Sequence, residues 1–165
     1  MPEGLELAVR AALVGIGATA VSDLWAWFAD RAFGLPRPDW AKVGRWIGHF
    51  PRGRFVHHNI AAAAPVAGER PIGWLAHYAI GIFFAGLVLA IFGLDWGRSP
   101  TLLPALFVGV ATVAATFLIM QPALGWGIAS SKMPDPTAAR LRSLANHTMF
   151  GICLYLAGLV VALLD

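Results

Sequence analysis

The sequence predicts an all-α integral membrane protein with four transmembrane helices. Of its 165 residues 58% are hydrophobic and only 13% are charged, whereas a soluble domain carries about 25% charged residues. Charge-free stretches of 24, 33 and 22 residues cover 71–94, 99–131 and 143–164, and each exceeds the roughly 20 apolar residues that cross a bilayer. A fourth apolar stretch precedes them. This composition argues against a cytosolic enzyme and against a nucleic-acid-binding protein.

We expect a single membrane domain over 1–165, with transmembrane helices at about 7–33, 71–94, 100–124 and 139–164. The first span contains Asp23 and is closed by Asp30 and Arg31. Acidic residues precede it and its apolar pattern runs on through Trp25 and Phe28. Both features differ from those of a signal peptide, so we expect this span to be retained.

The positions of the basic residues predict the orientation. Ten of the 12 Lys and Arg residues flank or fill the first connection, 34–70, and the third, 125–137. Arg10 and Arg98 lie on the other side. The positive-inside rule therefore places both basic connections in the cytoplasm and both termini in the periplasm of a bacterial inner membrane. This rule explains the basic excess without nucleic acid as a partner.

The first connection is too long for a simple turn and predicts a short helix at the membrane surface. Asp39 follows two prolines and is placed to cap this helix. Its apolar face consists of Trp40, Val43, Trp46 and Ile47, opposite Lys42 and Arg45. We expect this helix to lie among the lipid headgroups. A second short element is expected over 52–64, and the second connection, 93–100, is expected to be a tight turn.

The second and fourth spans open with one shared pattern. Arg70, Gly73, His77 and Gly81 match Arg140, Ser143, His147 and Gly151 without a gap. A weaker, gapped similarity relates Val14-Gly15 in the first span to Val108-Gly109 in the third. The repetition is typical of a duplicated unit and indicates two helical hairpins in tandem.

The repeat predicts a polar layer inside the membrane. His77 and His147 each follow the arginine that opens their helix by seven residues, or about 10 Å. Asp23 lies eight residues before Arg31 and reaches a similar depth, on the same stripe as Thr19. An ionisable side chain inside a membrane is costly unless it is paired, so these four residues form our candidate site for a ligand or a proton relay.

Several roles for this layer stay open. Asp23, His77 and His147 have the side chains of a pathway for protons, ions or a small polar solute. The two histidines suit the axial ligation of a b-type haem, and all three residues suit a transition-metal site with two histidines and one carboxylate. A purely structural network and catalysis on a lipid are further readings. No spacing in the sequence resembles HExxH, a nucleophile elbow or a phosphate-binding loop, and we expect a non-enzymatic role.

A second group of polar residues lies in the first connection. Its members are Arg45, His49, Arg52, Arg54, His57 and His58. Arginine binds phosphate and carboxylate groups well, so we expect this group to contact lipid headgroups or to guide an anion towards the polar layer. The lipid bilayer is the expected partner. A second copy of the chain is another, since four short helices enclose little volume.

Several strings resemble a bacterial family of small membrane proteins, domain of unknown function 2938. They are Gly44-Arg45-Trp46-Ile47-Gly48-His49, Gly53-Arg54-Phe55-Val56-His57, Gly73-Trp74-Leu75-Ala76-His77-Tyr78, Met120-Gln121-Pro122 with Gly125 and Gly127, and Arg142-Ser143-Leu144 with His147 and Phe150-Gly151. The resemblance spans nearly the whole chain. It implies a bacterial membrane protein with several spans, and it transfers no reaction, ligand or site residue.

Overall fold

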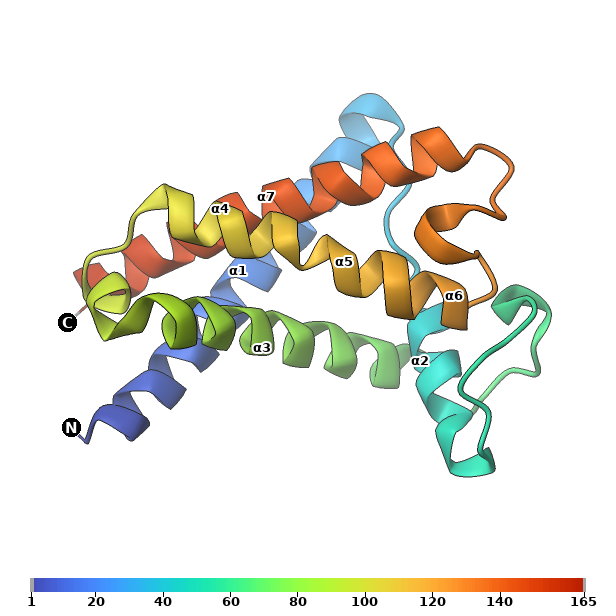
Figure 1. Cartoon of the computed structure of the whole chain (residues 1–165), viewed down its shortest axis with the longest axis horizontal. Helices are drawn as coiled ribbons and strands as arrows, with labels where there is room; N and C mark the ends of the chain where they lie inside the picture. Colours follow the sequence, from blue (N-terminus) through green and yellow to red (C-terminus); the bar gives the residue numbers. More distant parts are fainter. Residues whose placement is uncertain (1, 165) are drawn as a thin grey trace. The chain divides into compact units, whose positions relative to one another are not determined.

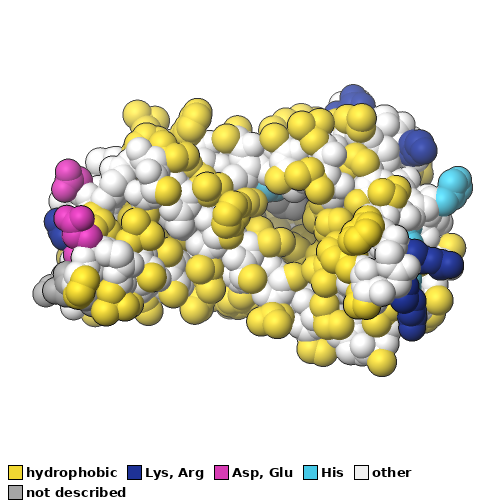
Figure 2. Space-filling model, turned by 60° about the horizontal axis from the view of Figure 1, so that its bottom comes forward, with side chains coloured by type: hydrophobic (Ala, Val, Ile, Leu, Met, Phe, Trp, Pro, Cys, Tyr) yellow, Lys and Arg dark blue, Asp and Glu magenta, His cyan; other side chains and the backbone are white. Residues whose placement is uncertain are grey.

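The computed structural model describes residues 2–164, and the regular elements of that part of the chain are all helical (Figure 1). Four helical stretches are long and apolar enough to cross a membrane: Glu3–Phe33, Glu69–Arg98, Leu102–Ala123 and Pro136–Leu163. This confirms the predicted fold class. Large apolar side chains stay exposed on all four stretches, and hydrophobic side chains cover most of the face shown in Figure 2. Such a surface suits lipid as the surrounding solvent.

The ends of two long helices follow local chemistry. Helix α1 covers Glu3–Phe33 and ends at Gly34, which has the left-handed conformation (φ 66°) that glycine adopts without strain. Helix α7 covers Pro136–Leu163. Proline suits the first turn of a helix because it has no N–H to leave unpaired. The Asp135 carboxylate accepts a hydrogen bond from the Ala138 N–H at 2.9 Å and so caps α7.

The middle helices are less regular than their hydropathy indicates. Helix α3 covers Glu69–Arg98 but breaks at Gly93, where φ is 76° and ψ is 176°. The chain is again helical from Leu94 to Arg98, whereas the sequence predicted a tight turn over 93–100. The third span consists of α4 (Leu102–Ala111), α5 (Val113–Ala115), the π-helix η3 (Thr116–Met120) and α6 (Gln121–Ala123).

The chain divides into two compact units, which we describe separately. Unit 1 contains residues 2–37, 78–111 and 146–164, and unit 2 contains residues 38–77 and 112–145. The apolar core of unit 1 includes Val14, Ala85, Val108 and Leu154, each at most 2% exposed.

Two close helix contacts in unit 1 are equivalent in the way the repeat predicts. A Cβ atom built on Gly15 of α1 would lie 2.7 Å from the Ile82 nitrogen and 2.8 Å from the Gly81 oxygen of α3. A Cβ atom on Gly109 of α4 would lie 2.5 Å from the Gly151 Cα atom of α7. Gly15 and Gly109 are the glycines related by the weaker similarity, and Gly81 and Gly151 are those related by the stronger one. Glycines at such positions let helices pack closely.

Unit 2 is built around α2 (Trp40–Gly48), the helix predicted in the first connection. The Asp39 carboxylate accepts a hydrogen bond from the Ala41 N–H at 3.2 Å, as the sequence predicted. Gly44 of α2 and Gly73 of α3 pack closely, since a Cβ on Gly44 would lie 2.6 Å from the Gly73 nitrogen. The 3-10 helices η1 (Phe50–Arg52) and η2 (Ile60–Ala62) follow, separated by non-helical chain instead of the single element expected over 52–64.

Candidate functional site

The structure gives Asp23 and Thr19 partners within unit 1. The Tyr78 hydroxyl donates to the Asp23 carboxylate over 3.4 Å. Thr19 is fully buried, and its hydroxyl donates to the Gly15 carbonyl at 2.7 Å. A Cβ atom on Gly81 would collide with that same hydroxyl. Thr19 therefore serves the close packing of α1 against α3.

His147 also bonds within unit 1. Its Nδ1–H donates to the Gly109 carbonyl at 3.2 Å, and its ring lies 6.4 Å from that of Phe84. This hydrogen bond places a proton on Nδ1. A histidine held in this way by a backbone carbonyl has the orientation that metal-ligating histidines commonly have. The carbonyl is that of Gly109, the glycine of the third span that the repeat relates to Gly15.

His77 belongs to unit 2, where its ring stacks on Trp40 of α2 with 3.8 Å between centroids. Trp74 lies edge-on to it at 5.8 Å. Among residues 2–164, no group of three His, Cys, Asp or Glu side chains is arranged to hold a metal ion. The metal, haem and relay hypotheses for Asp23, His77 and His147 therefore stay predictions.

Arg45 forms hydrogen bonds that hold the first connection together. Its guanidinium donates to both carboxylate oxygens of Glu69, at 2.8 Å each. It also donates to the carbonyls of Ile60, Ala61 and Ala63 at 3.2–3.3 Å. The pKa of Arg45 is raised because its guanidinium donates to the Glu69 carboxylate. Arg45 therefore binds partners within the chain, and its predicted contact with headgroups or an anion stays a prediction.

His49 and His57 form a hydrogen-bonded pair. His49 Nδ1 and His57 Nε2 are 2.7 Å apart, and the two rings are stacked. Burial lowers the pKa of His49, which is 2% exposed, and the nearby His57, Arg52 and Arg54 charges lower it further. His49 is thus buried and bonded to His57 inside the connection, and its predicted contact with headgroups or an anion stays a prediction.

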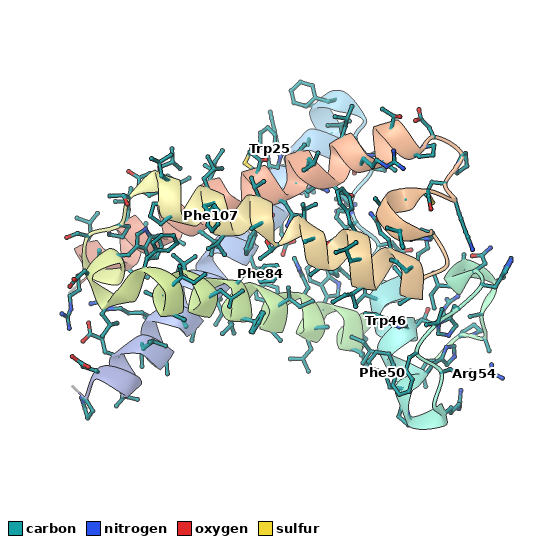
Figure 3. The ribbon with its side chains drawn as sticks, in the orientation of Figure 1. Trp25, Trp46, Phe50, Arg54, Phe84 and Phe107 are labelled. Carbon is teal, nitrogen blue, oxygen red and sulfur yellow. The ribbon has the colours of Figure 1, made fainter. Side chains whose placement is uncertain are left out.

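An aromatic cluster fixes the chain on either side of Arg52. The Trp46 indole N–H donates to the Phe55 carbonyl at 2.7 Å. The Phe50 ring packs against Trp46 and Phe55, with centroids 5.1 and 5.2 Å apart. Figure 3 shows Trp46 and Phe50 next to each other, with Arg54 extending away from them. Arg52 and Arg54 are exposed, and neither has an ion pair with a residue that the structure describes.

The first and third connections are joined backbone to backbone within unit 2. The His57 N–H donates to the Ala123 carbonyl at 2.8 Å, and the Ile60 N–H donates to the Leu124 carbonyl at 3.1 Å. Gly125 follows with φ 89°, and any Cβ atom there would collide with the His58 carbonyl. Glycine is required at this position for both reasons.

The loop after this junction is strained. Ala129 and Ser130 both have left-handed backbone conformations, with φ 46° and 61°. This conformation costs a residue other than glycine about 1–2 kcal/mol. The Arg140 guanidinium donates to the Ala129 carbonyl at 2.7 Å and holds the loop from α7. Strained loops that their surroundings hold in place are often found at functional sites.

An open groove of about 490 Å³ lies between the two connections. It is lined by Val56, His57, His58, Pro122, Gly125, Gly127, Ile128, Ser131 and Lys132. This lining contains hydroxyl, imidazole and ammonium donors but no carboxylate. The groove therefore offers a suitable environment for an anion. Of its polar residues, the sequence had pointed to His57 and His58; Ser131 and Lys132 were missed because no local pattern relates them to the first connection.

A charged cluster in unit 1 was also missed. Glu6 accepts hydrogen bonds from Arg10 at 2.9 Å and from Arg98 at 2.7 and 3.0 Å, and Arg10 donates to the Gly97 carbonyl at 2.9 Å. Glu6 and Arg10 are buried. Their i, i+4 spacing was the available signal. Arg98 is distant in sequence and had been used only to assign the orientation.

Comparison with known proteins identifies the family. The family model described as "Protein of unknown function (DUF2938)" matches residues 12–161, and the chain belongs to this family. No curated protein and no solved structure matches the chain.

Proposed function

We propose that this member of the DUF2938 family is a membrane protein that binds a small anionic group, a phosphate or a carboxylate, in the groove of unit 2. The observation that carries the proposal is the lining of the groove. It presents the donors of His58, Ser131 and Lys132 and no acidic side chain. Charge-assisted hydrogen bonds from such groups are the usual means of holding an anion.

The surroundings of the groove support the same ligand class. Arg52 and Arg54 are exposed on the first connection and add positive charge to unit 2. Val56 and Ile128, at 72% and 62% exposure, give the groove an apolar border. Cationic donors beside exposed apolar side chains suit the phosphate of a lipid headgroup as well as a free anion. The positive-inside rule supports a cytoplasmic location for the two basic connections that line the groove.

Binding of inorganic phosphate to the full chain in phosphatidylcholine nanodiscs tests the proposal. We expect Lys132→Ala to weaken phosphate binding about tenfold, because one charge-assisted hydrogen bond of about 1.5 kcal/mol is lost. Lys42→Ala is the matched control. Lys42 is a surface lysine of α2 that pairs with Asp39 at 3.4 Å and does not line the groove.

Nanodiscs with increasing phosphatidylglycerol distinguish a lipid headgroup from a free anion. If the headgroup is the ligand, phosphatidylglycerol displaces phosphate from the wild-type chain, and Lys132→Ala weakens this competition. If Lys132→Ala and Lys42→Ala bind phosphate equally well and compete equally with phosphatidylglycerol, the groove is not an anion site and the proposal is wrong.

A further inference from the structure

The groove of unit 2 is larger than a small anion needs. Its volume of about 490 Å³ falls within the range of about 300–1,000 Å³ that is typical of sites for drug-sized ligands. A bare phosphate ion fills only a small part of such a volume. The groove therefore has room for the organic part of a larger ligand.

The part of the lining that carries no donor is apolar. Val56, Pro122 and Ile128 supply it. Val56 and Ile128 lie in the two connections, outside the four spans, yet their side chains are 72% and 62% exposed. Exposed apolar surface bordered by polar residues is typical of a ligand-binding groove or of a membrane contact. This combination suits a ligand that is anionic at one end and apolar at the other.

The apolar side of the groove continues onto the third span. Pro122 lines the groove and also belongs to the span Leu102–Ala123. Leu118 and Ile119 lie about one helical turn before Pro122, and each is 62% exposed. A hydrocarbon chain that leaves the groove past Pro122 therefore meets further exposed apolar side chains.

The position of Pro122 also indicates the depth of the groove. The third span ends at Ala123, directly after Pro122. Ser131 and Lys132 follow in the third connection, beyond the end of the span. The polar headgroups of a bilayer begin where its hydrocarbon core ends. A groove at the end of a span thus lies at the level where a phospholipid carries its phosphate.

We propose that the ligand of the groove is an anionic phospholipid, with its phosphate at Ser131 and Lys132 and its acyl chains against Val56 and Ile128. This inference rests on the proposed anion binding and adds the apolar half of the ligand. A free anion uses the donors of the groove but leaves Val56 and Ile128 uncovered.

Binding of matched ligands to the full chain in a non-ionic detergent tests the inference. Dihexanoyl phosphatidic acid and glycerol 3-phosphate carry the same phosphate group, but only phosphatidic acid has acyl chains. We expect phosphatidic acid to bind at least about tenfold more tightly, because burial of a few methylene groups is sufficient for this factor. Dihexanoyl phosphatidylcholine has the same chains and no net charge. It should bind at least about tenfold more weakly than phosphatidic acid, because its headgroup does not complement the cationic lining.

Two variants remove apolar contact without removing a donor. Val56→Ser and Ile128→Ser should each weaken phosphatidic acid binding about three- to tenfold more than they weaken glycerol 3-phosphate binding. Leu141→Ser is the matched control. Leu141 belongs to unit 2 and is 62% exposed, like Ile128, but it does not line the groove. This control should bind both ligands as the wild type does.

The lipid assignment is overturned if phosphatidic acid binds no more tightly than glycerol 3-phosphate or than phosphatidylcholine. It is also overturned if Val56→Ser and Ile128→Ser behave like Leu141→Ser, or if they weaken both ligands by the same factor. Lys132→Ala separates this failure from that of the anion site. If Lys132→Ala weakens glycerol 3-phosphate binding while the serine variants behave like the control, the anion site stands and only the lipid assignment fails. If Lys132→Ala changes the binding of neither ligand, the anion site itself is wrong.

Discussion

Replacing Gly109 with alanine should disrupt the contact between α4 and α7. The new Cβ atom would lie 2.5 Å from the Gly151 Cα atom, 2.7 Å from the Gly151 nitrogen and 2.9 Å from the His147 oxygen. Carbon atoms in contact are normally about 3.5–4.0 Å apart, so the two backbones must separate locally by about 1 Å. All three close atoms belong to backbone, which cannot rotate away as a side chain does.

The cost follows from three contributions. Overpacking of this kind costs about 1–3 kcal/mol. Separation of the helices also weakens the hydrogen bond from His147 to Gly109, which is worth about 0.5–1.5 kcal/mol. Alanine in a helix recovers about 0.5–1 kcal/mol relative to glycine. We therefore expect a net loss of about 2 kcal/mol, or a fall in Tm of about 4–8 °C for a chain of this size.

The assay is thermal unfolding of the purified chain in detergent, followed by circular dichroism. Gly86→Ala on α3 is the matched control, because its Cβ would meet only the Ala11 Cβ atom, at 3.9 Å. We expect that control to be neutral or slightly stabilised. We expect Gly15→Ala to lose stability as well, because its Cβ would lie 2.7 Å from the Ile82 nitrogen and 2.8 Å from the Gly81 oxygen. If Gly109→Ala has the same Tm as Gly86→Ala, the close contact does not exist as described.

Three further outcomes are expected. Arg45→Ala should lower the free energy of unfolding by about 2–3 kcal/mol in chemical denaturation. This is less than the loss from breaking a fully buried ion pair, because Arg45 and Glu69 keep some exposure. Lys42→Ala should change the free energy of unfolding by under about 0.5 kcal/mol in the same experiment. His49 has a folded-state pKa below its unfolded one, so its contribution to stability is complete above the unfolded value near pH 6.5 and is lost as the pH falls from there through the lower folded-state pKa. His49→Gln should flatten this part of the stability–pH curve, and an unaltered curve would contradict the assignment. If the polar layer carries protons, Asp23→Asn should lower proton flux into proteoliposomes loaded with a pH-sensitive dye; unaltered flux would remove Asp23 from any such pathway.

The features that could be predicted from the sequence depend on local chemistry. Hydropathy located the four long helices, and Asp39 was correctly identified as a cap because a cap contacts residues next to it in the chain. The repeat pattern also named Gly81 and Gly151, which both lie at close helix contacts. Local patterns of this kind need no knowledge of the partner segment.

The features that could not be predicted depend on partners distant in the chain. Arg45 was expected to face an anion, because a count of charges does not show that Glu69 and three backbone carbonyls use its donors. The groove escaped notice because Lys132 and His58 are far apart in the chain, and the two connections are joined by backbone bonds to the Ala123 and Leu124 carbonyls. The break at Gly93 was mistaken for the start of a turn, since glycine permits both conformations.

The strain in the loop at Ala129 and Ser130 has a consequence for the groove. Ile128 and Ser131, on either side of this pair, both line the groove, whereas Arg140 holds the pair from α7 without lining it. The left-handed residues would relax to ordinary backbone angles if the Arg140 anchor were lost, and the groove wall would change shape with them. We therefore expect a substitution at Arg140 to alter the proposed anion binding without removing a donor from the groove.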